Sequence, residues 1–171
     1  MYKVGIVTLS DKGAHGERKD LSGPKIQELL PKDKYEVISY TILPDDREKI
    51  RRELLRLSDE VKCDLVLTTG GTGFSPRDIT PEATMDVAER SAPGIAEGLR
   101  AYSMQFTKRA ILGRGVSVIR KGTLIINLPG SVRAVTESME FLIGNMEHGL
   151  DILMQTDNEC GRVRTERGEI K

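Results

Sequence analysis

The segment from residue 65 to 84 combines a glycine-rich turn with charged side chains that could do chemistry. An apolar run, Leu65–Leu67, leads into Thr69-Gly70-Gly71-Thr72-Gly73, and Arg77-Asp78 follows before a helix start at Thr80-Pro81-Glu82. Glycine has no Cβ atom, so the backbone N–H groups of such a turn can approach a ligand closely and surround an anion. A carboxylate beside the turn can hold Mg²⁺, which binds one or two carboxylates together with phosphate oxygens. The segment therefore predicts a phosphate or nucleotide site with a metal ligand attached.

The same features also have structural explanations. A glycine-rich turn after a strand can be a tight connection and nothing more, and Asp78 can be a turn or cap residue. The phosphate interpretation is favoured because Arg77 and Asp78 follow the turn within a few residues and precede a helix N-terminus. Such a terminus carries about half a positive charge, which attracts anions. Glu82, in the first turn of that helix, is better explained by the helix dipole than by catalysis.

Three more loops carry polar or glycine residues directly after expected strands, at Ser10-Asp11, Pro44-Asp45 and Pro129-Gly130-Ser131. Pro-Asp-Asp before a helix is a common capping arrangement, so Asp45 fits either a capping role or, if Asp46 is the cap, a ligand role at the edge of the sheet. The pair Ser10-Asp11 fits either a local turn or hydrogen bonds to a polar ring or hydroxyl group. Ser131 fits the N-cap of the last helix, and the same turn can present N–H groups to a second phosphate.

The elements that position these loops follow from hydrophobic periodicity. The expected strands are 4–9, 35–43, 64–69, 116–119 and 123–128, and the expected helices begin near Ser22, Asp46, Pro81 and Pro93, with a last one after Ser131. The helix from Pro81 is expected to reach Arg90, and Arg120-Lys121-Gly122 is expected to turn an antiparallel hairpin. The alternation of strands and helices predicts a three-layer α/β fold, with a mostly parallel, doubly wound sheet and helices on both faces.

This topology gathers the four loops. Right-handed crossovers place the carboxyl ends of parallel strands at one edge of the sheet, and ligands of open α/β sheets bind outside that edge. The convergence of several carboxylates and two glycine turns at one edge is stronger support for a ligand site than any single loop.

Bulk properties narrow the class of protein. We expect one α/β domain over residues 1–155 and a polar tail over 156–171. The 26 basic and 26 acidic residues give no net charge, which argues against nucleic acid or a membrane as partner. Neither the P-loop nor the dinucleotide pattern occurs. Cys63 and Cys160 lack CxxC spacing, and the N-terminus shows no signal peptide, so we expect a cytoplasmic protein.

Three motifs together resemble the molybdopterin adenylyltransferase family. They are Thr69-Gly70-Gly71-Thr72-Gly73, the segment 75–84 that contains Arg77-Asp78-Ile79-Thr80-Pro81, and Asn127-Leu128-Pro129-Gly130-Ser131. The likeness is to the bacterial MogA type, which is related to the G domain of gephyrin, and covers roughly residues 2–155. It implies transfer of AMP from ATP to the terminal phosphate of molybdopterin, with release of pyrophosphate, in molybdenum cofactor biosynthesis.

The resemblance also implies roles for single residues. Asp45 and Asp78 match the two catalytic aspartates of the family, which are associated with Mg²⁺. The turn Gly70–Gly73 matches its phosphate-binding loop, and Pro129-Gly130-Ser131 matches part of its ligand site. The residues expected to bind substrate are Ser10, Asp11, Thr69, Gly70, Gly71, Thr72, Gly73, Arg77, Pro129, Gly130 and Ser131. Among these, Arg77 is expected to neutralise charge.

The partners implied by the resemblance are molybdopterin, ATP, Mg²⁺, other copies of the chain in a homotrimer, and a metal-insertion protein that receives the product. The sister MoaB type includes members that lack an aspartate in the segment equivalent to Arg77-Asp78, and this chain retains it. The alternative is a non-catalytic molybdopterin carrier or scaffold, which would use the same phosphate cradle without needing both aspartates.

Overall fold

The computed structural model describes residues 1–154, and the expected polar tail lies outside them. The strands are β1 (Tyr2–Leu9), β2 (Tyr35–Leu43), β3 (Leu65–Thr69), β4 (Arg90–Ser91), β5 (Ser117–Arg120) and β6 (Thr123–Leu128). The helices are α1 (Asp11–Ala14), α2 (Ser22–Leu29), α3 (Arg47–Leu55), α4 (Thr80–Met85), α5 (Pro93–Ser103), α6 (Val132–Leu142) and α7 (Glu147–Leu153), with helical turns η1 (Arg56–Glu60) and η2 (Lys108–Leu112).

All six strands form one sheet in the order β2-β1-β3-β6-β5-β4. The strands β2, β1, β3 and β6 are parallel, β5 pairs antiparallel with β6, and β4 pairs antiparallel with β5. The expected hairpin is therefore present, with its turn at residues 121 and 122. The chain passes from β1 to β2 on one side and later to β3 on the other, which creates a topological switch point at the carboxyl ends of β1 and β3.

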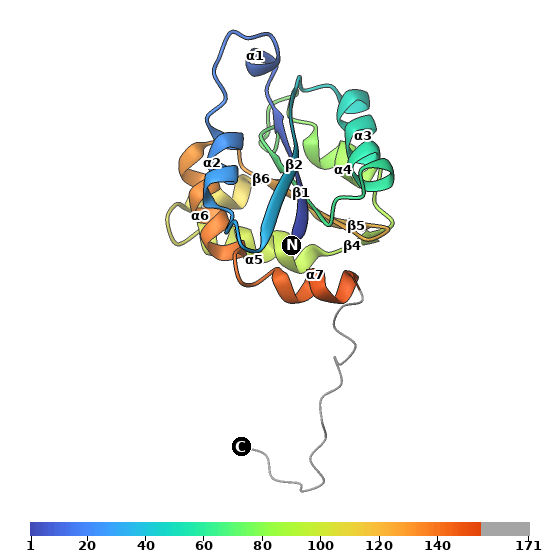
Figure 1. Cartoon of the computed structure of the whole chain (residues 1–171). Coiled ribbons are helices and arrows are strands. Elements are labelled where there is room, and N and C mark those ends of the chain that lie inside the picture. The colour runs from blue at the N-terminus through green and yellow to red at the C-terminus, as the bar shows by residue number, and fades with distance from the viewer. Residues whose placement is uncertain (155–171) are drawn as a thin grey trace, which may run out of the picture.

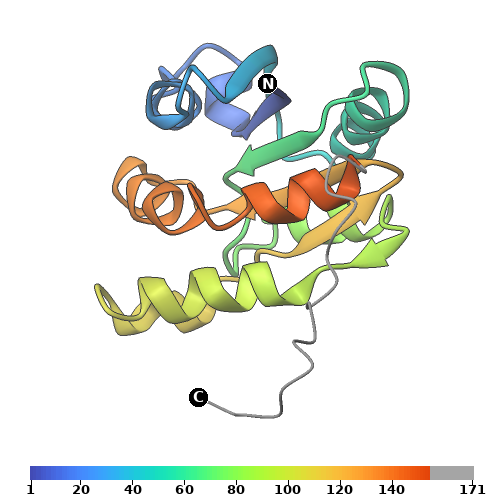
Figure 2. The same cartoon turned by 60° about the horizontal axis from the view of Figure 1, so that its bottom comes forward.

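Helices cover both faces of the sheet, as the sequence predicts. One core packs α2, α5, α6 and α7 against one face, and a second core packs α3, η1 and α4 against the other. Figures 1 and 2 show the sheet between α2, α5 and α6 on one side and α3 and α4 on the other. Val4 and Ile6 of β1 point into the first core, whereas Val7 and Leu9 point into the second. A strand buried on both faces explains why the sequence of β1 is a continuous apolar run.

The helix expected from Pro81 to Arg90 is wrong in its second half. The helix α4 ends at Met85, and Arg90–Ser91 forms the edge strand β4. The backbone N–H groups of Glu89 and Ala92 donate to Ile119 and Ser117 at 3.1 and 2.9 Å. These N–H groups satisfy carbonyl groups of β5, so this segment pairs with the sheet and does not continue the helix.

The single helix expected after Ser131 is two helices, α6 and α7. Gly144, which lies between them, has a φ of +85°, a left-handed conformation that ends helices. The apolar stripe Val135, Met139, Leu142 and Met146 is nevertheless buried throughout in one core. The periodicity therefore continues across the break because both helices pack on the same side of the sheet.

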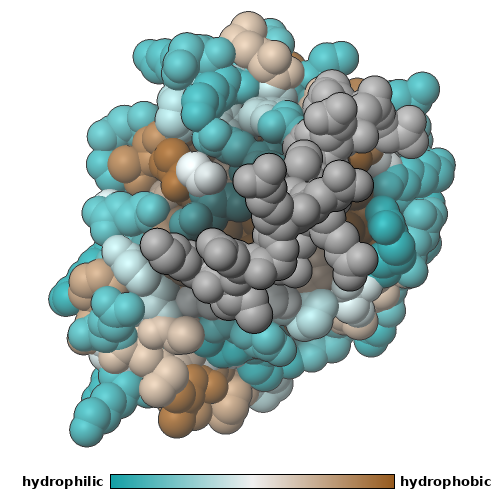
Figure 3. Space-filling view, turned by 90° about the horizontal axis from the view of Figure 1, so that it is seen from below, coloured by the Kyte–Doolittle hydropathy of each residue, from teal (hydrophilic) through white to brown (hydrophobic). Residues whose placement is uncertain are grey.

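The described residues contain no helix that is long and apolar enough to cross a membrane. Seen from below, hydrophilic side chains cover much of the visible face, and apolar side chains gather in small areas between them (Figure 3).

Candidate active site

The loops after β1, β2, β3 and β6 meet at the switch point and enclose a cavity of about 420 Å³. Eight of the residues predicted from the sequence line it: Ser10, Asp45, Thr69, Gly70, Gly71, Asp78, Gly130 and Ser131. Two others, Thr72 and Pro129, line a second cavity. Asp11, Gly73 and Arg77 line neither cavity. The topology thus brings most of the predicted residues together, as expected for an open α/β sheet.

The backbone of the glycine turn packs directly against the end of β1 and against Asp45. Gly70 and Gly71 have φ values of +99° and +64°, which side chains rarely adopt. A Cβ atom on Gly70 would collide with the Leu9 carbonyl, and one on Gly71 would lie 2.9 Å from Oδ1 of Asp45. The hydroxyl of Thr80 donates to the Gly70 carbonyl at 3.0 Å. Glycine is therefore required here because the turn must lie directly against β1 and Asp45.

Asp45 is positioned by a reciprocal pair of hydrogen bonds with Asp11. The Asp45 N–H donates to Oδ1 of Asp11 at 3.0 Å, and the Asp11 N–H donates to Oδ2 of Asp45 at 3.2 Å. The remaining oxygen, Oδ1 of Asp45, is buried and has no hydrogen-bond partner within residues 1–154. Asp46 caps α3 by accepting from Lys49 N, so the structure confirms that Asp45 is not the capping residue.

The electrostatics of Asp45 follow from this position. Burial raises the pKa of its carboxyl, the Asp11 N–H lowers it, and the negative charges of Asp11 and Asp78 raise it again. A buried carboxylate oxygen without a donor is costly unless a cation or a proton completes it. Asp45 is therefore an oxygen ligand that a bound cation would stabilise.

Asp78 lies against the far end of the glycine turn, beside Gly73. Its Oδ2 accepts from the Ser75 N–H at 2.9 Å, and the Asp78 N–H donates to the Ser75 carbonyl at 2.9 Å. A Cβ atom on Gly73 would lie 2.8 Å from the same carboxylate oxygen. Asp78 is thus a turn residue that also lines the first cavity, so the two interpretations of its role are compatible.

Arg77 is engaged by Asp11. Its guanidinium donates from Nε and Nη2 to the two Asp11 carboxylate oxygens at 2.8 to 3.0 Å. This hydrogen bonding lowers the pKa of Asp11 and raises the pKa of Arg77. The pair joins the loops after β1 and β3, outside both cavities.

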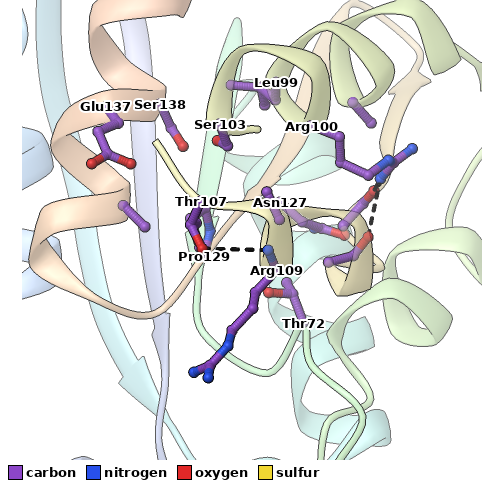
Figure 4. Close-up of a pocket in the computed structure, with 15 residues that line it drawn as sticks. Thr72, Leu99, Arg100, Ser103, Thr107, Arg109, Asn127, Pro129, Glu137 and Ser138 are labelled. Carbon is purple, nitrogen blue, oxygen red and sulfur yellow. Dashed lines mark hydrogen bonds between the residues drawn. The ribbon is translucent and has the colours of Figure 1, made fainter. Parts of the chain in front are cut away.

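The second cavity, of about 240 Å³, lies beyond the glycine turn between α5, α6 and η2. Its walls are largely apolar, with Leu99 and Pro129 among them, and the side chains in Figure 4 converge from several elements. The Ser138 hydroxyl, on α6, is buried there without a hydrogen-bond partner in the described part of the chain. Thr72 and Pro129 directly adjoin Gly71 and Gly130 of the first cavity, so the two cavities share their dividing wall.

Asp20 is a site residue that the sequence analysis missed. Its carboxylate lines the first cavity and accepts from the hydroxyls of Thr8 and Tyr40, each at 2.6 Å, and from the N–H groups of Ser22 and Gly23. Ser22 in turn donates to the Gly130 carbonyl at 2.8 Å. The bond from the Ser22 N–H, two residues on, makes Asp20 an Asx-turn residue before a helix, a local signal that could have been noticed.

The basic side chains that line the two cavities were also missed by the sequence analysis. Arg18 and Lys19 line the first cavity, and Arg100 and Arg109 line the second. Arg100 donates to the Gly115 carbonyl at 2.8 Å. Local sequence gives no signal for these residues because their segments reach the cavities only through the fold.

The donor set suits a metal ion that shares its coordination with a substrate. No group of three or more histidine, cysteine or acidic side chains that could hold a metal occurs within residues 1–154. Three carboxylates line the first cavity, and because Asp20 already accepts from two hydroxyls and two N–H groups, Asp45 and Asp78 are the two left to hold a metal ion. Mg²⁺ is usually bound by one or two carboxylates plus phosphate oxygens and water. A pair of carboxylates therefore suits an open Mg²⁺ site, whereas a closed structural site would need about four protein ligands.

The fold and the site define an α/β protein with two adjoining cavities at a glycine-rich phosphate-type turn. The family model described as a probable molybdopterin binding domain matches residues 5–148. This match covers most of the chain, and the chain belongs to that family.

Individual relatives agree. The chain is 39% identical to a molybdopterin adenylyltransferase of Helicobacter pylori J99 over 88% of this chain and 87% of that protein. It is 43% identical to one of Haemophilus influenzae, covering 82% and 72% of the two chains. The structure is similar to that of the molybdopterin biosynthesis enzyme MoaB from Thermus thermophilus, with a TM-score of 0.86 and 42% identity over 91% of this chain and 98% of the other.

Proposed function

We propose that this protein transfers AMP from ATP to the terminal phosphate of molybdopterin in molybdenum cofactor biosynthesis. The observation that carries the proposal is the pair of cavities on either side of one glycine turn, with Asp45 and Asp78 against that turn. A transfer between two substrates needs two adjoining sites that meet where the bond is made. The relatives named molybdopterin adenylyltransferase support the substrate assignment.

The reaction joins two anions. An oxygen of the pterin phosphate attacks the α-phosphorus of ATP, the bond from that phosphorus to the bridging oxygen of the β-phosphate breaks, and pyrophosphate leaves. Positioning and charge neutralisation supply most of the catalysis of such transfers, and the protein need not form a covalent bond. The backbone N–H groups of Gly71–Gly73 and of Gly130 would bind phosphate oxygens at the shared wall, whereas the Gly70 N–H already donates to the Leu128 carbonyl at 3.3 Å.

Asp45 and Asp78 would hold Mg²⁺, and this assignment is part of the proposal. The free, buried Oδ1 of Asp45 and the adjacent carboxylate of Asp78 supply the protein ligands. Bound Mg²⁺ neutralises part of the charge of the phosphates. Its presence also offsets the cost of the buried Asp45 oxygen, which has no donor within residues 1–154.

The other predicted residues keep roles that agree with their positions. Thr69 donates to the Pro129 carbonyl at 2.7 Å and so fixes the shared wall. Ser10 and Ser131 cap α1 and α6 while they line the first cavity. Asp11 would act through Asp45, and Arg77 would act on incoming phosphates only after it leaves Asp11.

The alternative is a non-catalytic carrier of molybdopterin. The structural resemblance to a protein named MoaB keeps it in view. A carrier needs one ligand cavity and a phosphate cradle. The second cavity and the unpartnered oxygen of Asp45 favour the enzyme, because neither serves a carrier.

Assembly and cellular context complete the proposal. We propose a cytoplasmic homotrimer that hands adenylylated molybdopterin to a metal-insertion protein. Sedimentation of the purified full chain measures the oligomeric state.

The deciding experiment is to incubate the full-length protein with molybdopterin, ATP and Mg²⁺ and to measure adenylylated pterin and pyrophosphate. The expected result is equal amounts of both products, with none when Mg²⁺ is removed by a chelator. Pterin binding without either product would support the carrier. Turnover that persists in chelator would refute the role of Mg²⁺ while keeping the transferase.

A further inference from the structure

Arg114 lies in the short segment that leads from η2 into β5, beside the loop that carries Asp78. Its backbone N–H donates to the Thr72 carbonyl at 2.9 Å. Its side chain reaches across the same loop, with Nε donating to the Gly73 carbonyl at 2.7 Å and Nη2 donating to the Asp78 carbonyl at 2.5 Å. One residue thus satisfies three carbonyl groups on the loop from residue 72 to 78.

The guanidinium is also tied to the helix that follows the loop. Its Nη1 is hydrogen-bonded to Oε1 of Glu82, in the first turn of α4. This bond lowers the pKa of the Glu82 carboxyl. Glu82 therefore serves to orient Arg114 across the loop as well as to complement the helix dipole. The planar fork of an arginine suits several acceptors at fixed angles, which a lysine cannot match.

Apart from Arg114, the tip of the loop is anchored by the exposed ion pair of Arg77 with Asp11, and such pairs contribute little to stability. Residues 74–77 at its tip are exposed. The hydrogen bonds between Ser75 and Asp78 lie within the loop and do not attach it to the rest of the protein. Arg114, by contrast, connects the two ends of the loop to the segment that leads into β5.

The backbone around Arg114 is itself fixed from the second cavity. Arg100 on α5 donates from Nη1 to the Gly115 carbonyl at 2.8 Å and to the Gly113 carbonyl at 3.4 Å. Arg100 lines the second cavity, as do Gly113 and Gly115. A chain of hydrogen bonds therefore runs from Arg100, in the wall of the second cavity, through the backbone around Arg114 to the loop that carries Asp78.

We propose that Arg114 is a positioning residue that holds Asp78 in place by hydrogen bonds to loop carbonyls rather than by contact with a substrate. Arg114 lines neither cavity, whereas its acceptors Gly73 and Asp78 lie on the loop beside the first. A misplacement of about 1 Å costs on the order of 10²-fold in rate when a catalytic group must be aligned. The activity readout of this inference rests on the proposed transferase function, and its structural readout does not.

The test compares three variants of the full chain. Arg114→Lys keeps the charge and removes the fork. Glu82→Gln removes the ion pair but leaves the carbonyl bonds available. Arg120→Lys is the matched control, because Arg120 makes a similar fork to Asp59 and a bond to the Val87 carbonyl elsewhere on the sheet.

Hydrogen exchange of the amide of residue 114, which donates to the Thr72 carbonyl, and of the Thr80 amide, which donates to the Gly71 carbonyl, reports the attachment of the loop without any substrate. In Arg114→Lys these amides are expected to exchange about tenfold faster or more, with no such change in Arg120→Lys. Turnover is expected to fall about tenfold or more, while molybdopterin binding changes by less than about threefold. Glu82→Gln is expected to show a smaller change of the same kind.

Two other outcomes overturn the inference. Lost turnover with unchanged loop exchange would mean that Arg114 acts directly on a substrate. Equal losses in Arg114→Lys and Arg120→Lys would mean general destabilisation. Absence of transfer by the native protein would refute the proposed function alone, because loop exchange would still test the positioning role.

Discussion

The two aspartates at the glycine turn are held in opposite ways. Asp45 follows a long strand, exchanges two N–H-to-carboxylate hydrogen bonds with Asp11, and keeps a buried oxygen without a partner in the described chain. Asp78 lies on a loop with an exposed tip and satisfies its carboxylate within that loop. The first carboxylate follows a strand of the sheet, and burial of its charge costs stability, whereas the backbone that carries the second is held by a hydrogen bond from Arg114 to the Asp78 carbonyl. One metal site would thus combine a rigid ligand with an adjustable one.

Replacement of the adjustable ligand is expected to have the largest effect. In Asp78→Asn the amide oxygen can still accept from Ser75, so the loop keeps its turn while the metal loses a charged ligand. We expect turnover to fall about 10²- to 10³-fold, the range for removal of one group that stabilises transition-state charge. Steady-state kinetics at several Mg²⁺ concentrations measure the loss. Unchanged turnover with intact ATP binding would contradict the metal assignment.

The rigid ligand is expected to show a smaller loss of activity and a gain in stability. Asp45→Asn should lower turnover by about tenfold to 10²-fold. Because the folded pKa of Asp45 is raised, the unfolded chain releases this proton first, and the carboxylate costs stability as the pH rises above its ordinary pKa of 3.8.

Asp45→Asn should therefore unfold at a higher temperature than the native chain at neutral pH, with the difference vanishing in acid below pH 3.8. Thermal unfolding at both pH values, without Mg²⁺, measures it. A variant less stable than the native protein at neutral pH would show that Asp45 is satisfied by the protein itself.

The glycine turn links the two ligands, and Gly71→Ala tests the link. A left-handed φ costs a residue with a Cβ about 1–2 kcal/mol, and the new methyl group would also press on Thr80 and Asp45. We expect the free energy of unfolding to fall by about 1–3 kcal/mol. Urea denaturation measures the change, with Gly122→Ala at the hairpin turn as a control, since a Cβ atom there meets nothing within 4 Å.

The smallest effect on stability is expected for removal of the ion pair between Arg77 and Asp11, which lies outside both cavities. Arg77→Gln removes an exposed pair with Asp11, and such pairs contribute little to stability. The Asp11 pKa is lowered in the native chain, so this contribution is present above pH 3.8 and is lost as the pH falls through the lowered folded pKa. NMR titration should show the Asp11 pKa rising toward its ordinary value in the variant. No change in that pKa would mean that the pair does not persist in solution.

Features that depend on neighbouring residues could be predicted from the sequence, and features that depend on distant segments could not. The parallel sheet, the hairpin and the gathering of four loops follow from apolar periodicity and the rules of crossover handedness. Asp46 and Ser131 could be recognised as caps because a cap depends on neighbouring residues, and the structure confirms both. The strand β4 was missed because its partner β5 lies far along the chain, with Ser91 opposite Val118 in the register.

Arg114 and Asp20 were missed for a related reason. The side-chain partners of Arg114 lie 32 to 41 residues before it, and two of them are backbone carbonyls, which leave no trace in side-chain patterns. The hydroxyl donors of Asp20 come from two strands. Side chains that organise a site through backbone groups can be identified only once the fold has brought the segments together.

The place of β6 in the sheet has a consequence for how the site is made. This strand, the last of the sheet in sequence order, pairs in parallel with β3 near the centre of the sheet. A growing chain that has not yet reached residue 123 leaves the edge of β3 open, and open edges promote wrong pairing. The wall shared by the two cavities is closed only when Pro129 and Gly130 arrive behind β6. Ligand binding is therefore a property of the finished chain, and pterin affinity can serve as a late marker of folding, after most of the secondary structure has formed.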